Sequence, residues 1–195
     1  MWRTAVLIGV TILLLTVLSA QVLTPPAQTF PVAFQGVRGH VRVYQPAAWM
    51  WARWQAGQPP SVLAFTDERA GVIHASARTY LRTLPHEASH LYDAQTGAAD
   101  ADEVVEACAA APVRFAFSDE PTAAVLRRDL RGLRYYCSAG EIRARFRSFI
   151  VGSFCKGGSA AMFGLPGRAG NCVKVPLYAR MPLSEALRAA TGRAP

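Results

Sequence analysis

The residue types best suited to metal chemistry lie together in the pentapeptide His86-Glu87-Ala88-Ser89-His90. On a helix, residues four positions apart project from one face with Cβ atoms about 5 to 6 Å apart, which lets two imidazoles hold one Zn²⁺. Glu87 would point toward the flank where a zinc-bound water sits, so it is the expected general base. The competing interpretation is two histidines that merely share a helix face, and the pattern favours the metal site.

The segments around this motif predict how it is positioned. Residues 61–66 predict a buried strand, residues 67–71 a turn and residues 72–75 a second short strand. A helix follows, because apolar residues recur at helical spacing at Tyr80, Leu81, Leu84, Ala88 and Leu91. Pro85 predicts either a kink in that helix or a helix that starts near it. Both alternatives leave the two histidines one turn apart.

The stretch from Thr83 to Asp93 resembles the active-site helix of zincin metallopeptidases, particularly bacterial gluzincin-like families whose helix reads LPHExxH. A downstream stretch from Tyr135 to Arg145 resembles the Y…EIxAR helix of bacterial and phage-associated zincin-like proteins, in which the glutamate binds the metal. The resemblance covers about half of the chain after residue 23. It does not extend to metzincins, because Asp93 and Thr96 stand where their extended motif has Gly and a third ligand.

The resemblance implies an α+β fold in which a small mixed sheet packs on the HExxH helix and on a downstream glutamate-bearing helix. Catalytic zinc generally keeps three protein ligands, so the resemblance implies His86, His90 and Glu141. Ser138 stands three residues before Glu141, so the same glutamate also fits a capping box. The other rivals are Glu103 and Glu106, which lie nearer the spacing of thermolysin-like enzymes but equally suit an acidic first helical turn.

Four further residues are candidates for supporting roles. Asp93 could accept a hydrogen bond from a ligand imidazole and fix its tautomer, or simply close the helix before Gly97. His74, on the second strand, could steady an oxyanion, although a lone strand histidine is more often structural. Tyr135 and Tyr136 could donate to a tetrahedral intermediate, whereas core packing is the alternative role for at least one of them.

The first 23 residues predict export, as a signal peptide or as an N-terminal membrane anchor. Arg3 is the only charge there, residues 5–20 are almost entirely apolar, and Ala20 offers a small residue at a cleavage point. The apolar run continues to Leu23, which approaches the length needed to span a bilayer. We therefore expect residues 24–195 to form one zincin-like domain outside the cytoplasm, either secreted or anchored to the membrane.

The four cysteines favour two disulfides in an oxidising compartment. Three connectivities are open, and we favour Cys108 with Cys137 and Cys155 with Cys172 because these pairs would tie neighbouring helices and staple a Gly-rich loop. No CxxC pair suggests a structural zinc site.

The remaining sequence predicts peripheral elements and a basic surface. Residues 24–36 are expected to be a linker or extended arm, 41–44 a strand, 47–55 a short helix or a partly exposed aromatic patch, and 182–190 a closing helix. The formal net charge of +8, carried mainly by arginine, suits an anionic membrane or cell-wall surface, although a solvated arginine face is the default interpretation. Nucleic acid is not expected, because no binding motif is recognisable.

Together these patterns predict a zinc-dependent metallopeptidase that cleaves a peptide or protein substrate by Glu-assisted attack of a zinc-bound water. One alternative is a non-catalytic envelope module that retains the fold as a scaffold. Another is a zinc hydrolase of peptidoglycan crosslinks, favoured by compartment and charge but by no motif. The presence of Glu87 favours an enzyme, because zinc binding alone does not require this residue.

Overall fold

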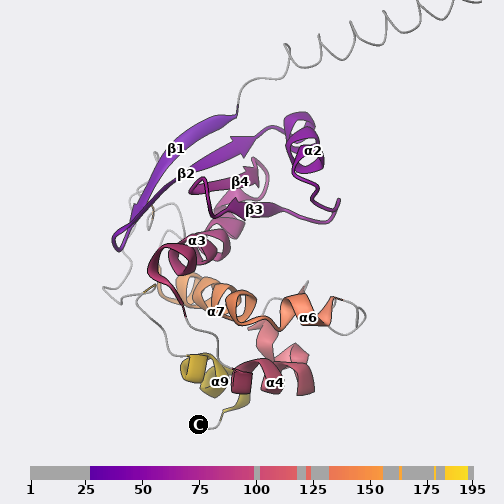
Figure 1. Ribbon diagram of the computed structural model, residues 1–195, viewed down its shortest axis with the longest axis vertical. Helices are drawn as coiled ribbons and strands as arrows, with labels where there is room; N and C mark the ends of the chain where they lie inside the picture. Colours follow the sequence, from indigo (N-terminus) through magenta and orange to yellow (C-terminus); the bar gives the residue numbers. More distant parts are fainter. Residues whose placement is uncertain are drawn as a thin grey trace, which may run out of the picture.

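The computed structural model describes residues 27–98, 102–117, 122–123, 132–155, 163, 178 and 183–192. A four-stranded sheet lies on helix α3 (Tyr80–Thr96), and helix α7 (Ala139–Phe154) runs along the other side of α3 (Figure 1). Helices α4 (Asp102–Ala110) and α9 (Leu183–Thr191) pack beyond α7. The molecule is therefore α+β, with α3 and α7 between the sheet and a small helical cluster.

The sheet is mixed, and its strand order is β1-β2-β4-β3. Strands β1 (Gln28–Phe34) and β2 (Val37–Tyr44) form an antiparallel hairpin. Strand β4 (Val72–Ser76) runs parallel to β2, and β3 (Ala64–Asp67) pairs antiparallel with β4 at the sheet edge. The sequence predicted a linker or an extended arm over residues 24–36, and the linker alternative is wrong for residues 28–34. Val32 and Phe34 alternate toward the core and make this segment a strand.

Helix α3 is continuous from Tyr80 and contains Pro85 in its interior, so it does not start at the proline. Its fully buried residues Leu84, Ala88 and Leu91 pack in the same core as the strand residues Val41 and Ile73. The helix ends at Gly97, whose φ of 70° is a left-handed conformation that glycine adopts without steric cost. The apolar residues thus decide which face of α3 packs on the sheet. His86 and His90 lie on another face of the helix, which is turned toward α7.

The helical cluster below α7 has its own core. It contains residues of α4, of the 3-10 helix η1 (Pro112–Ala116), of α7 and of α9. The closing helix expected over residues 182–190 is confirmed as α9, whose residues Leu183, Ala186 and Leu187 are buried in this core. A disulfide joins Cys108 of α4 to Cys137, which follows the short helix α6 (Leu133–Tyr136), as expected. Cys155 is also disulfide-bonded, and its expected partner Cys172 lies outside the described residues.

The leader expected over residues 1–23 lies outside the part of the chain that the structure describes. Among the described residues, no helix combines the length and apolar character needed to cross a bilayer.

A buried charge cluster joins α3 to α7. The two carboxylate oxygens of Asp93 accept hydrogen bonds from Arg143 Nε at 2.6 Å and from the Arg147 guanidinium at 2.7 Å. Arg147 is only 1% exposed and also donates to Ser89 Oγ at 2.6 Å. Because buried charges are tolerated only when they are paired, this cluster fixes how α7 sits along α3.

Replacing Asp93 with Ala should lower the free energy of unfolding by about 3–5 kcal/mol, because two buried guanidinium groups lose their counter-ion. Urea denaturation of the two proteins measures this difference. The matched control is Glu106→Ala on the exposed surface of α4, which should change stability by no more than about 0.5 kcal/mol. Equal effects of the two substitutions would contradict the assigned role of Asp93.

Candidate metal centre

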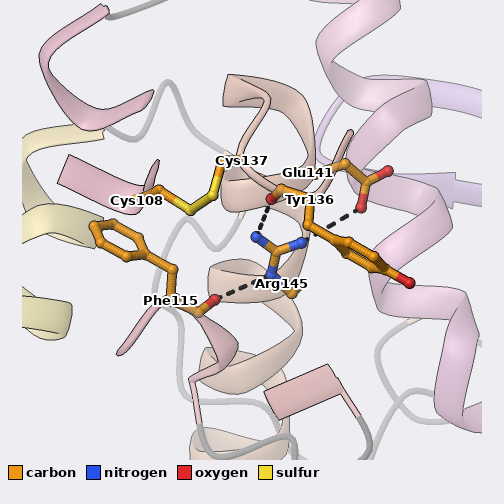
Figure 2. Close-up of a disulfide and its surroundings, with 6 residues drawn as sticks. All are labelled: Cys108, Phe115, Tyr136, Cys137, Glu141 and Arg145. Atoms are coloured by element: carbon orange, nitrogen blue, oxygen red, sulfur yellow. Dashed lines mark hydrogen bonds and ion pairs between the residues drawn. A yellow bond between two sulfur atoms is a disulfide. The ribbon is translucent and has the colours of Figure 1, made fainter. Parts of the chain in front are cut away.

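Two histidines of α3 and one glutamate of α7 converge on a single point. The Nε2 atoms of His86 and His90 lie 3.2 Å apart, and they lie 3.3 Å and 3.2 Å from the two carboxylate oxygens of Glu141. Glu141 stands in the first turn of α7 and projects toward α3 (Figure 2). The structure thus brings together all three residues that the sequence suggested as metal ligands, and they form a possible metal-binding triad.

The spacing of the triad fits zinc. Bonds of about 2.0–2.1 Å in a tetrahedron place neighbouring ligand atoms about 3.3–3.4 Å apart, close to the separations in this triad. Two imidazole nitrogens and a carboxylate are also a common donor set for catalytic zinc. The three residues therefore suit a site that keeps one coordination position open.

The charge of Glu141 suits a metal ligand. Burial raises the pKa of its carboxyl, but hydrogen bonds and charge from His86 and His90 outweigh burial and hold that pKa well below its ordinary value. The Ser138 side chain makes no capping hydrogen bond at the start of α7. The glutamate carboxylate consequently faces the two imidazoles, and the capping box that the sequence left open does not form.

Glu87 lies beside the triad and is fixed by the edge strand. Its side chain is only 7% exposed. Thr66 of β3 donates from Oγ1 to Glu87 Oε2 at 2.8 Å, and the same hydroxyl lies 3.0 Å from the Glu87 carbonyl oxygen. This contact holds the carboxylate in one orientation, as a general base requires. Sequence reasoning assigned Thr66 no functional role, because no local pattern predicts that its strand packs beside Glu87.

The triad borders a cleft made of two adjoining hollows. The larger, of about 690 Å³, is lined by His86, and the smaller, of about 420 Å³, by His90. Glu87 and Glu141 line both hollows, as does Tyr135. Residues 61–64, which lead into β3, form one wall of the larger hollow, and apolar side chains of Leu81, Phe117, Phe149 and Val151 line other parts of it. A substrate in this cleft would reach Glu87 and the triad together.

Arg145 links the triad to the disulfide (Figure 2). It stands one turn after Glu141, and the two side chains form an ion pair at 3.7 Å. The guanidinium also donates to the carbonyl oxygens of Phe115, at 3.0 Å, and of Tyr136. Because Cys137 follows Tyr136 and is bonded to Cys108, the disulfide holds the turn that anchors Arg145. The start of α7 is thereby fixed from the side opposite to α3.

The structure places Asp93 and His74 away from the supporting roles suggested for them. Both oxygens of Asp93 are engaged by arginines of α7, so the residue holds the two helices together rather than orienting an imidazole. His74 shares a hydrogen bond of 2.8 Å with Tyr44 and stacks on Phe65 at 4.6 Å. It lies on the sheet face opposite to α3, because its neighbours Ile73 and Ala75 occupy the core face.

The two tyrosines differ in their relation to the cleft. Tyr135 lines both hollows, whereas Tyr136 lines only the larger one and its ring lies near the Arg145 guanidinium. Partial burial and the neighbouring Glu141 carboxylate raise the pKa of the Tyr135 phenol. The Tyr135 phenol therefore stays a protonated donor at neutral pH.

The rival carboxylates lie elsewhere. Glu103 and Glu106 are exposed on α4, and the described part of the chain contains one cluster of His, Cys, Asp or Glu with ligand geometry, which does not include them. The thermolysin-like spacing therefore does not bring a glutamate of α4 to the histidines.

Replacing Glu141 with Ala should lower zinc affinity steeply, because two histidines leave the ion underligated. Competition titration with a chromogenic chelator measures the change, and circular dichroism checks that α7 still folds. The matched control, Glu106→Ala, should keep the affinity of the unmodified protein. Zinc lost from the Glu106 variant but retained by the Glu141 variant would overturn this ligand assignment.

No protein-family model, curated protein or solved structure matches the chain.

Proposed function

We propose that this chain is an exported zinc-dependent metallopeptidase with a zincin-like fold. The observation that carries the proposal is the meeting of His86, His90 and Glu141 at 3.2–3.3 Å beside the buried carboxylate of Glu87. A metal-holding scaffold needs only the first three residues. Glu87 adds a second carboxylate, which is buried, fixed by Thr66 and lines the cleft, and this arrangement suits general-base chemistry.

The proposed reaction divides the work among the residues of the site. The two imidazoles and Glu141 would hold Zn²⁺, which supplies Lewis acidity toward a peptide carbonyl and lowers the pKa of water. Glu87 accepts a proton at its carboxylate from the attacking water and delivers it to the leaving amine nitrogen. Tyr135 and Tyr136 line the cleft and offer phenol donors to the developing oxyanion.

The shape of the cleft supports an extended peptide as the substrate. Strand β3 is a sheet edge, and the residues leading into it line the larger hollow. Backbone groups at an open edge pair readily with an added extended segment. The apolar residues Leu81, Phe117 and Phe149 in the same hollow would favour apolar side chains on that peptide.

The leader and the cysteines support the proposed compartment. Residues 1–23 have the composition of a signal peptide or anchor, and the disulfide between Cys108 and Cys137 suits an oxidising compartment. Peptidoglycan crosslinks remain within this substrate class as an alternative, because they are amide bonds in the same compartment.

Replacing Glu87 with Gln should abolish hydrolysis and leave zinc affinity unchanged, because the amide can neither accept the proton of water nor return it. Cleavage of a denatured protein and of a random peptide library, read by mass spectrometry, measures activity. Zinc content of both proteins is the control. Activity retained in the Gln variant would disprove the mechanism, and an inactive parent protein that holds zinc would favour the non-catalytic scaffold.

Replacing Thr66 with Val should lower kcat by about 10- to 100-fold with little change in KM, because Glu87 loses the hydroxyl that orients it. Thr66→Ser keeps that hydroxyl and should restore most of the activity. Steady-state kinetics with a peptide identified from the library distinguishes the two variants. Equal activity of the Val and Ser variants would show that the hydroxyl does not position the base.

A further inference from the structure

Helix α2 (Pro46–Gln55) turns an apolar face outward. Its exposed apolar residues are spaced three, four and seven positions apart and thus share one stripe: Ala47, Met50, Trp51 and Trp54. Met50 is 61% exposed, Trp51 43% and Trp54 68%, and the two indole rings stack at 4.8 Å. Trp49 on the opposite side is buried and packs on Tyr44 and Phe65. The helix is therefore anchored by one tryptophan and presents two others to the outside.

A stripe of large exposed apolar side chains is unusual on the surface of a globular domain. Tryptophan buries a large apolar area when it is covered, so two adjacent exposed rings with a methionine indicate a surface that binds something. We call the residues Met50, Trp51 and Trp54 the α2 patch. The remaining question is which partner covers it.

The position of the α2 patch in the fold points to a membrane. Gln28 at the start of β1 pairs with Val43 at the end of β2, and α2 begins three residues after Val43. The start of the described chain and α2 therefore lie at the same end of the sheet (Figure 1). Only residues 24–27 separate this end from the apolar segment 5–23, and four residues span at most about 14 Å. A bilayer that held this segment would lie next to α2.

The charges near the α2 patch suit the same partner. No aspartate or glutamate occurs before Asp67 in the sequence. Before this point, Arg42 in β2 and Arg53 in α2 lie at the α2 end of the sheet, so the charges that this segment brings there are purely basic. Anionic lipid headgroups attract arginine near the surface, and tryptophan concentrates at the boundary between headgroups and acyl chains.

We propose that the α2 patch is a membrane-docking surface that inserts Trp51 and Trp54 into the interfacial region of an anionic bilayer beside the N-terminal apolar segment. The proposal does not depend on the metal centre, because Met50, Trp51 and Trp54 line neither of the two described hollows beside the triad.

Fluorescence quenching by brominated lipids tests this docking. The full chain with Trp2→Phe, which retains Trp49, Trp51 and Trp54, is reconstituted into vesicles of phosphatidylglycerol and phosphatidylcholine brominated near the headgroup. Bromine quenches only tryptophan that touches lipid, so the emission of this protein should fall strongly. Adding Trp51→Phe and Trp54→Phe should remove most of that quenching and leave the buried Trp49 emission unaffected.

A matched control uses the opposite end of the molecule. Arg188 is exposed on α9, which lies far from α2 (Figure 1). Arg188→Trp in the doubly substituted chain should give unquenched emission in the same vesicles. Quenching that is unchanged by loss of Trp51 and Trp54, or equal at position 188, would overturn the proposal. So would loss of a dimer in detergent on substituting the patch without any lipid quenching, because that result assigns the patch to a second copy.

Discussion

The buried pairing of Asp93 with Arg143 and Arg147 is the interaction on which the site depends. The imidazoles belong to α3 and the carboxylate to α7, so the triad exists only while the two helices keep one register. Asp93 lies one turn after His90, and Arg143 lies two residues after Glu141. The ion pair between Asp93 and Arg143 therefore lies within about one helical turn of a metal ligand on each helix. An apolar contact would tolerate sliding of one helix along the other, whereas a buried charge loses its partner when the register changes.

Glu141 illustrates how tertiary structure decides between two local uses of one side chain. In isolation, Ser138 and Glu141 have the spacing of a capping box. In the folded protein, two imidazoles face the carboxylate and hold its pKa below the ordinary value, and the Ser138 side chain makes no capping hydrogen bond. Arg145, anchored on the turn that the disulfide holds, approaches the same carboxylate from the other side. The Glu141 side chain is thus held by the imidazoles of α3 on one side and by Arg145 on the other.

The sequence predicted the parts of the structure that local periodicity encodes. Spacing alone predicted the HExxH helix, the short strands β3 and β4 and the helix α9. The approach of Glu141 to the histidines was predicted only by the resemblance of its helix to a known motif, because spacing left a capping box open. Strand β1 was missed because Pro31 interrupts its alternation and Pro25 and Pro26 precede it. The face of His74 could not be predicted, since four mostly apolar residues carry no period-two signal. The partners of Asp93 and the contact of Thr66 with Glu87 join segments far apart in sequence, and no local pattern records them.

The two proposed surfaces meet in the segment that connects α2 to β3. The guanidinium of Arg53 in α2 donates to the carbonyl oxygen of Pro60, so the helix holds this connection in place. Gln58 and Val62 line the smaller hollow, and Leu63 lines the larger one. Helix α2, which would rest on a bilayer, therefore also holds in place the segment that forms a wall of the proposed peptide cleft. A bilayer at the α2 patch would set the distance between the cleft and the membrane surface, which favours substrates whose cleavable segments extend only a short way from the bilayer.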